Sequence, residues 1–233
     1  FREFDDATNR LGNSLLASGL KPGDRAGVML PNSIDCLVTY YAIAKCGLIR
    51  VGLNPRDTVE DHIYKLGESG CRALIHNNHE TLSEEVELSI GPTRLASMIT
   101  NGDSSPCAIE RDLDAPFRLG FTGGTTGKPK AVTLTSRGEL SELSAFLTDL
   151  VPDVRQGDLF LHAAPIAHAS GAFFLPALCR GGQSIIMQKF DAAEFVSLAE
   201  KTQANMTFLV PTMLAMILEV PNLNDARLNF RRI

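Results

Sequence analysis

The stretch FTGGTTGKPKAVTLTSRG, residues 121–138, combines glycines and threonines with Lys128 and Lys130. Glycine lets backbone N–H groups turn toward an anion and approach it closely, while hydroxyl and ammonium groups add donors and positive charge. The composition therefore favours a loop that holds phosphate. Apolar runs at 117–122 and 131–135 flank the loop, and we predict that they pair as a β-hairpin with the loop at its tip. A flexible hairpin tip with solvated lysines is the alternative that composition alone leaves open.

The stretch does not match two familiar phosphate-binding motifs. A P-loop reads G-x-x-x-x-G-K-(S/T). With Gly127 and Lys128 as its G-K pair, the first glycine would fall at Thr122 and the Mg²⁺-binding hydroxyl at Pro129. No G-x-G-x-x-G opens a helix after a strand. The sequence therefore disfavours an ordinary P-loop NTPase and gives no support to a dinucleotide-binding fold.

On both sides of this stretch, apolar runs alternate with amphipathic helical patterns. The predicted strands are residues 26–30, 48–53, 71–76, 117–122, 131–135, 158–166, 184–188 and 206–210. The expected N-terminal helix caps are Asn32 or Ser33, Thr58 with Asp61, and Asp191 with Glu194, and Pro211 is expected to open the last helix. Residues 77–115 are interpreted as loops with one short helix and one short strand. The alternation predicts an α/β fold of layered parallel sheets flanked by helices.

Composition limits the class of protein. The 233 residues are 44% hydrophobic and 21% charged, which suits a globular chain, and a net charge of −5 without a long basic run argues against nucleic-acid binding. The 5 cysteines form no C-x-x-C pair, which argues against a disulfide framework or a zinc site and favours a reduced compartment, the cytoplasm. No apolar run reaches the ~20 residues that span a bilayer, and no signal-peptide pattern opens the chain.

The loop and three further segments carry a resemblance to the adenylate-forming enzymes. FTGGTTGKPKAVTLTSRG resembles their phosphate-binding signature, (Y/F)-T-S-G-T-T-G-x-P-K-G-V. Residues 9–56 are similar to the amino-terminal run of that family, PIAHASGAF at 165–173 resembles its P-x-x-H-x-x-G segment, and FLVPTMLAMIL at 208–218 resembles the segment that lines its acyl pocket. The resemblance implies an incomplete large amino-terminal AMP-binding domain. Its first α/β lobe would comprise residues 24–165, and residues 166–233 with 1–23 would form part of the second.

The resemblance also implies a role for each matching position. The ATP phosphates would be held by Thr122, Gly123, Gly124, Thr125, Thr126, Gly127, Lys128 and Lys130. The substrate pocket would be lined by Gly171, Phe173, Pro211 and Thr212, with His168 at its mouth near the adenylate. Without the motif, His168 reads as an ordinary core or surface histidine, and we interpret His162 as structural. We expect no metal site among these residues.

Two positions depart from the family pattern. Gly123 stands where the family commonly has serine, and Ala131 stands where it commonly has glycine. The first change removes a hydroxyl donor, and the second adds a methyl group close to the exit of the loop. Backbone donors remain at both positions, so neither change need abolish phosphate binding.

The reaction that the resemblance implies has two steps. A carboxylate attacks the α-phosphorus of ATP and releases pyrophosphate, and a thiol, usually that of coenzyme A, then attacks the acyl-adenylate. The expected cofactors are ATP and Mg²⁺, with coenzyme A as co-substrate and a small carboxylic acid as substrate. The chain is thus expected to be the amino-terminal part of an ATP-dependent carboxylic acid–CoA ligase. The alternatives are an adenylation domain of a peptide-synthetase-type system and a non-catalytic nucleotide-binding module.

We predict that these 233 residues do not turn over by themselves. In the family, the segments that bind adenine, ribose and Mg²⁺ and that supply the catalytic lysine follow the ones matched here, so the catalytic residues are expected beyond Ile233. A pyrophosphate-release assay on the isolated chain, with ATP and a panel of carboxylic acids, should show no release above the acid-free background. Robust release with any acid would contradict the prediction.

Overall fold

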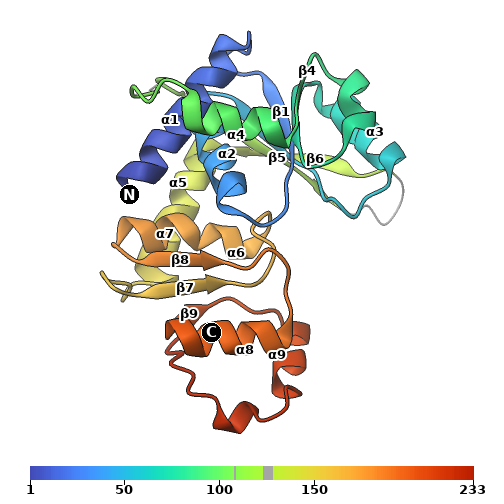
Figure 1. The fold of residues 1–233 in the computed structure, drawn as a ribbon. Helices are drawn as coiled ribbons and strands as arrows, with labels where there is room; N and C mark the ends of the chain where they lie inside the picture. Colours follow the sequence, from blue (N-terminus) through green and yellow to red (C-terminus); the bar gives the residue numbers. More distant parts are fainter. Residues whose placement is uncertain (108, 123–127) are drawn as a thin grey trace. The chain divides into compact units, whose positions relative to one another are not determined.

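The computed structural model describes residues 1–107, 109–122 and 128–233 (Figure 1). The chain forms two compact units, each with a sheet of its own. The first unit comprises Phe1–Pro31 and Asp35–Leu140, and the second comprises Asn32–Ile34 and Ser141–Ile233.

Helix α1 (Arg2–Ala17) belongs to the first unit, whereas the sequence led us to expect residues 1–23 with the second lobe. Leu11 and Leu15 of α1 are fully buried in one apolar cluster with Leu95 of helix α4 (Pro92–Asn101). Because this cluster lies against the first sheet, α1 is part of the core of the first unit. The main segment of the second unit begins at residue 141 rather than near residue 166.

Six strands form the sheet of the first unit in the order β4-β3-β1-β2-β5-β6. They are β1 (Arg25–Met29), β2 (Ile49–Gly52), β3 (Cys71–His76), β4 (Leu88–Ile90), β5 (Pro116–Thr122) and β6 (Lys130–Thr135). Neighbouring strands are parallel except β5 and β6, which form an antiparallel hairpin. The predicted α/β class and the pairing of the two runs that flank the glycine-rich loop are confirmed.

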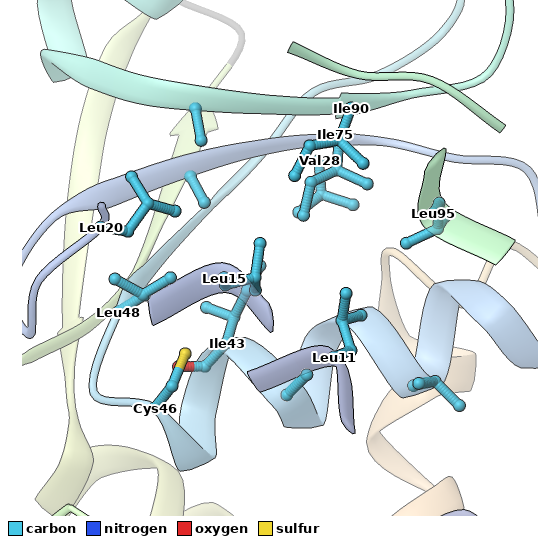
Figure 2. Packing of buried hydrophobic residues seen from close by; sticks show 14 of the residues in the cluster. Leu11, Leu15, Leu20, Val28, Ile43, Cys46, Leu48, Ile75, Ile90 and Leu95 are labelled. Atoms are coloured by element: carbon cyan, nitrogen blue, oxygen red, sulfur yellow. The ribbon is translucent and has the colours of Figure 1, made fainter. Parts of the chain in front are cut away.

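Helices cover both faces of this sheet. They are α1, α2 (Ile34–Lys45), α3 (Val59–Ser69) and α4 (Pro92–Asn101), with a short 3-10 helix η1 (Glu80–Glu85). Successive residues of a strand point to opposite faces. Val28 and Ile75 accordingly pack with α1, α2 and α4 (Figure 2), while Met29 and Leu74 pack with Leu66 of α3 on the other face.

Helix α3 begins at the cap that the sequence predicts. Thr58 Oγ1 accepts the N–H of Asp61 at 3.1 Å, and the Asp61 carboxylate accepts the N–H of Thr58 at 3.3 Å. This reciprocal pair satisfies two donors that the first turn of a helix leaves free. Gly70 ends the helix with φ at 59°, in the left-handed region that glycine adopts most readily.

Residues 77–115 hold more regular structure than we expected. In place of one short helix and one short strand, they form η1, β4 and the ten-residue helix α4. Pro92 occupies the start of α4, where its missing N–H would have no helical partner. Leu95, Met98 and Ile99 form the apolar face of α4, and the turn-forming residues on either side obscure this short pattern in the sequence.

Three parallel strands form the sheet of the second unit in the order β8-β7-β9. They are β7 (Leu159–His162), β8 (Gln183–Ile186) and β9 (Met206–Thr207). Helix α5 (Ser136–Ala145) begins in the first unit, passes into the second at residue 141 and continues into η2 (Phe146–Leu150). The later helices of the second unit are α6 (Ala169–Ala172), α7 (Phe174–Cys179), α8 (Ala192–Thr202), α9 (Pro211–Leu218) and η3 (Leu223–Asp225). Leu161, Phe195 and Ile217 belong to the apolar core of this unit. Asp191 caps α8 by accepting the N–H of Glu194 at 2.9 Å, as predicted.

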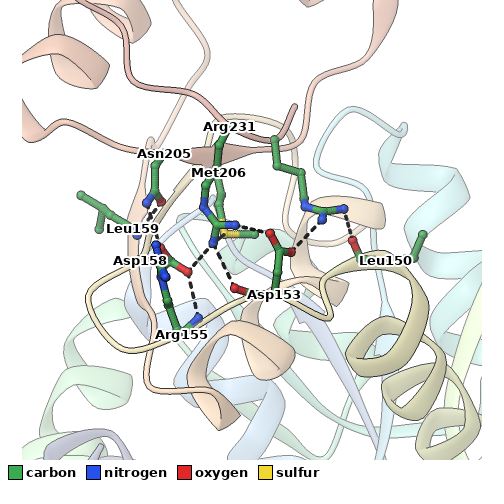
Figure 3. A network of polar contacts seen from close by, with 9 residues as sticks. Leu150, Asp153, Arg155, Asp158, Leu159, Asn205, Met206 and Arg231 are labelled. Atoms are coloured by element: carbon green, nitrogen blue, oxygen red, sulfur yellow. Dashed lines mark hydrogen bonds and ion pairs between the residues drawn. The ribbon is translucent and has the colours of Figure 1, made fainter.

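A buried carboxylate organises the polar side of the second unit (Figure 3). Asp158, just before β7, accepts the N–H of Arg155 at 2.8 Å and the side-chain amide of Asn205 at 2.9 Å, and it pairs with Arg231. A buried charge needs such partners because losing one leaves the charge without compensation. The network therefore ties the residues around Arg231 to the strands β7 and β9.

Two buried histidines of the first unit differ in their hydrogen bonding. His62, on α3, is 2% exposed, and neither of its ring nitrogens has a hydrogen-bond partner within the described part of the chain. His76, at the end of β3, is 1% exposed, but its Nε2 lies 2.9 Å from Ser89 Oγ and its Nδ1 accepts the N–H of His79 at 3.0 Å. An unpaired buried polar group destabilises a fold, whereas a paired one does not.

We therefore expect opposite effects from the same substitution at these two positions. His62→Leu should raise the free energy of unfolding by about 1 kcal/mol, because it removes two unpaired nitrogens and keeps an apolar side chain of similar size. His76→Leu should lower the free energy of unfolding by about 1–3 kcal/mol, because it leaves its partners without hydrogen bonds. Urea unfolding of both variants near neutral pH measures the difference. A destabilised His62→Leu variant would show that its nitrogens have partners in solution.

Candidate functional site

The predicted phosphate loop lies at the end of the β5–β6 hairpin. Thr122 and Lys130 form the last pair of the two strands, and both side chains are exposed, as is that of Lys128. The remaining members of the predicted set, Gly123, Gly124, Thr125, Thr126 and Gly127, lie outside the described residues. Two ammonium groups therefore flank the loop and are open to solvent, where they are available to an anion. The Thr122 hydroxyl beside them donates to the carbonyl oxygen of Lys130 at 3.5 Å.

Helix α3 contacts the chain on both sides of the loop, at Phe121 of β5 and at Lys128 and Pro129 just before β6. Tyr64 donates a hydrogen bond from its hydroxyl to the carbonyl oxygen of Pro129 at 3.2 Å, and Lys128 Nζ lies 4.8 Å from the centre of the Tyr64 ring. Lys65, which pairs with Asp57 at 2.5 Å, lies 5.6 Å from the ring of Phe121. A cation over an aromatic ring is stabilised by about 0.5–1 kcal/mol at an exposed site. Sequence reasoning missed Tyr64 because nothing near it marks a contact with residues 65 positions later.

Ala131, one of the two departures from the family pattern, lies on β6 opposite Phe121. Its side chain is exposed. The additional methyl group therefore meets solvent and leaves the pairing of the hairpin intact. Gly123, the other departure, lies outside the described residues.

The second group of predicted residues surrounds the turn that follows β7. Ala163 and Ala164 continue from the strand and are buried, and the chain then turns so that the N–H of His168 donates to the carbonyl of Pro165 at 3.1 Å. His168 is the N-cap residue of α6, but its side chain makes no capping hydrogen bond. The imidazole is exposed at the end of the turn, where a ligand can reach it.

His162, the last residue of β7, holds the other end of this turn from inside the core. It is fully buried and stacks on Phe160 with ring centres 4.4 Å apart. Nδ1 lies 3.1 Å from the carbonyl oxygen of Ser170, so Nδ1 carries the hydrogen, and Nε2 accepts from Ser184 Oγ at 3.1 Å. Burial lowers the pKa of His162 to about 4. These contacts support the structural interpretation of His162.

Asn32 makes contacts that we did not expect from the sequence. We expected Asn32 or Ser33 to cap the helix that follows. The Asn32 carboxamide instead bonds to distant backbone of the second unit, to which Asn32 itself belongs. Its Oδ1 accepts the N–H of Ile166 at 2.9 Å, and its Nδ2 donates to the carbonyls of Ala164 at 3.1 Å and Met187 at 3.2 Å. One side chain thus bridges the residues that follow β7 and β8.

Position 171 requires glycine because the backbone of Ile166 comes very close to it inside the turn. A Cβ atom on Gly171 would lie 2.0 Å from the carbonyl oxygen of Ile166, which no side chain can tolerate without a backbone shift. The glycine of the P-x-x-H-x-x-G segment is therefore needed for the shape of this turn. Its part in a substrate pocket remains a prediction.

The other predicted pocket residues follow the carboxyl ends of β7 and β9. Phe173 packs with Phe208, whose ring centre is 5.4 Å away, and also with Phe146 at 4.8 Å. Pro211 and Thr212 are exposed in the first turn of α9. Ligands of parallel α/β sheets bind outside the carboxyl ends of the strands. Phe173 and the segment leading to α9 are thus neighbours, while the hairpin residues belong to the other unit.

The described residues offer few alternative sites. No group of three or more histidine, cysteine, aspartate or glutamate side chains within 1–107, 109–122 and 128–233 is arranged to hold a metal ion. No helix in these same segments is both long and apolar enough to cross a bilayer. All five cysteines are free thiols, and Cys179 is exposed while the other four are buried.

Comparison with known proteins places these features in one family. A family model described as AMP-binding enzyme matches residues 1–232. A feruloyl-CoA synthase of an Amycolatopsis species is 33% identical over 100% of this chain and 48% of its own length. The medium/long-chain-fatty-acid–CoA ligase FadD8 of Mycobacterium tuberculosis is 32% identical over 88% of this chain and 40% of its own length. The chain thus spans less than half the length of these curated relatives.

Solved structures agree with this result. The inhibitor-bound N-terminal domain of FACL13 from Mycobacterium tuberculosis is 26% identical, with a TM-score of 0.88 over 98% of this chain and 60% of that one. A fatty acyl CoA synthetase of the same organism also has a TM-score of 0.88 at 26% identity, over 98% of this chain and 47% of that one. The likeness confirms the expected fold, that of the amino-terminal domain of adenylate-forming enzymes.

The depressed pKa of His162 predicts a stability loss in acid. An unfolded histidine takes up a proton below about pH 6.5, but the buried His162 does so only near pH 4. The free energy of unfolding should therefore fall as the pH drops from about 6.5 to about 4, by up to about 3 kcal/mol from this residue. Denaturant unfolding at several pH values should show this loss in the parent and in Ser184→Ala, which keeps the imidazole. Because burial also lowers the pKa of His62 and His76, part of the loss should remain in His162→Gln, but it should be smaller there than in the parent. An unchanged pH dependence in His162→Gln would contradict the assignment.

Proposed function

We propose, because this chain belongs to the AMP-binding enzyme family, that it is the amino-terminal part of an ATP-dependent carboxylic acid–CoA ligase that works through an acyl-adenylate. The observation that carries the proposal is the β5–β6 hairpin. It bears a family signature at its tip and exposes Lys128 and Lys130 beside it. The names of the relatives, a feruloyl-CoA synthase and a medium/long-chain-fatty-acid–CoA ligase, support the reaction class.

In the first step, the hairpin would stabilise the negative charge of the nucleotide phosphates. A carboxylate oxygen attacks the α-phosphorus, and the bond to the bridging oxygen of pyrophosphate breaks, so negative charge develops on the leaving group. The ammonium groups of Lys128 and Lys130, with the hydroxyl of Thr122, would hold the β- and γ-phosphates and stabilise that charge. Because α3 fixes Pro129 through Tyr64, these donors would be positioned before ATP arrives.

Mg²⁺ is expected to enter with ATP, since it commonly bridges phosphate oxygens. The donor set of the hairpin does not suit it as a resident ion. Lys128 and Lys130 are cations that repel a metal, and Thr122 contributes a single neutral oxygen. The described hairpin residues therefore bind phosphate rather than metal in this proposal, and no step is assigned to Mg²⁺ through them.

The acid would bind near the turn that follows β7. His168 would lie at the mouth of the pocket close to the adenylate, and Phe173, Pro211 and Thr212 would contact the acyl group. The ring of Phe173 and the exposed first turn of α9 offer mainly apolar surface, which suits an aromatic or aliphatic acid. Coenzyme A would supply the thiol for the second step. The buried free cysteines favour a reduced compartment, and we propose the cytoplasm.

The proposal is tested with the full-length protein, ATP, coenzyme A and a panel of aliphatic and aromatic acids. Acid-dependent pyrophosphate release is expected. Lys128→Ala and Lys130→Ala should each raise the KM for ATP about 10- to 100-fold, because each removes a charged hydrogen bond to phosphate. Lys201→Ala is the matched control: Lys201 is exposed in the last turn of α8, and its loss should leave KM unchanged.

Two results would count against the proposal. The ligase assignment fails if no acid in the panel promotes pyrophosphate release or thioester formation. The phosphate-binding role fails if both hairpin lysine variants behave like Lys201→Ala in an enzyme that is otherwise active.

A further inference from the structure

Both polar atoms of the Asn32 carboxamide form hydrogen bonds with buried backbone groups. Its oxygen accepts from the N–H of Ile166, and its nitrogen donates to the carbonyls of Ala164 and Met187, at 2.9, 3.1 and 3.2 Å. Ala164, Ile166 and Met187 are only 2–3% exposed. Buried peptide groups are costly to leave unpaired. Asn32 therefore supplies partners that solvent cannot readily replace.

The same turn is held at two further points. Ser170 is bound through its carbonyl by His162 Nδ1 at 3.1 Å, and Gly171 lies so close to the carbonyl of Ile166 that only glycine fits. His168 lies between these constraints, two residues after Ile166 and two before Ser170. Its own side chain is exposed and takes no part in capping α6. The backbone of His168 is thus determined from both sides, while its imidazole is left for a ligand.

We propose that Asn32 is a positioning residue for His168: by fixing the backbone of residues 164–166 it sets where the imidazole meets the substrate. The proposal rests on the substrate-pocket role proposed above for His168. Asn32 itself touches backbone and no reacting atom. A displacement of about 1 Å of a group that orients substrate can reduce a rate by about 100-fold.

The geometry requires a carboxamide at position 32. Aspartate would keep the acceptor for the N–H of Ile166 but would place a carboxylate oxygen against the carbonyls of Ala164 and Met187. Alanine would remove all three hydrogen bonds. Comparing Asn32→Asp with Asn32→Ala therefore separates the acceptor contact from the two donor contacts. The Ile166 N–H should keep its hydrogen-bond partner in the first variant and lose it in the second.

The first experiment follows amide hydrogen exchange in the full-length protein. Asn32→Ala should speed exchange at the Ile166 amide about tenfold or more relative to amides within β7, whereas Asn32→Asp should keep that amide protected. The matched control is Asn13→Ala in the first unit. Asn13 also donates to two backbone carbonyls, those of Asp103 and Ser105, both at 2.9 Å. It should leave the Ile166 amide unchanged. Asn32→Ser replaces Asn32→Ala if the latter does not fold, since a single hydroxyl cannot form all three hydrogen bonds.

The second experiment is a double-mutant cycle on acid-dependent pyrophosphate release. Asn32→Ala and His168→Ala should each lower kcat/KM for the acid about 10- to 100-fold, and the double variant should be no worse than His168→Ala. Asn13→Ala should stay within about twofold of the parent. A residue that acted only through overall stability would give losses that add to those of His168→Ala.

The possible failures are distinguishable. Unchanged exchange at Ile166 in Asn32→Ala, or additive losses in the cycle, would overturn the positioning role in an active ligase. Full activity of His168→Ala would overturn the role of His168 and, with it, the positioning proposal. A parent protein that shows no acid-dependent release overturns the proposed function instead, and in that case the exchange experiment still decides whether Asn32 fixes the turn.

Discussion

Three buried peptide groups beyond the ends of β7 and β8 need hydrogen-bond partners, and one carboxamide provides them. These hydrogen bonds hold the part of the second unit in which its predicted substrate-pocket residues lie. Strand ends leave backbone groups without ladder partners, and a chain that turns inside a core cannot rely on water for them. Asn32 meets the need of Ala164, Ile166 and Met187 together. Ile166 in turn contacts Gly171, and His162 bonds to the carbonyl of Ser170. The backbone is therefore held on both sides of the exposed His168.

The two predicted sites are built in different ways. The hairpin carries its predicted functional groups exposed at and next to the strand ends, and it is supported from one side by the Tyr64 ring and hydroxyl. The turn after β7 is supported from within, by His162 and Asn32. Both sets of contacts hold groups that a ligand would meet. The Tyr64 hydrogen bond fixes Pro129 between Lys128 and Lys130, and the contacts of His162 and Asn32 fix the backbone on both sides of His168.

Local signals in the sequence predicted much of the fold, and distant contacts account for what they missed. The Thr58–Asp61 pair and the alternating strands depend on near neighbours, so the capping box and the α/β class could be read directly. Asn32 after a strand fits a helix cap equally well, and only its contacts 132 to 155 residues away show its role. The contact of Tyr64 with Pro129 could not be predicted for the same reason, because the two residues lie 65 positions apart. Resemblance indicated Gly171, but the backbone approach that demands it was visible only in the structure.

The separation of Asn32 from its partners also has a consequence for the emerging chain. Strand β6 ends at Thr135, so every strand of the first sheet is present once that residue has left the ribosome. The Asn32 side chain must wait until residue 187 is made before its last hydrogen bond can form. During synthesis, at about 5–20 residues per second, this interval lasts seconds. The turn that bears His168 therefore reaches its final form late, after the first sheet has had time to assemble.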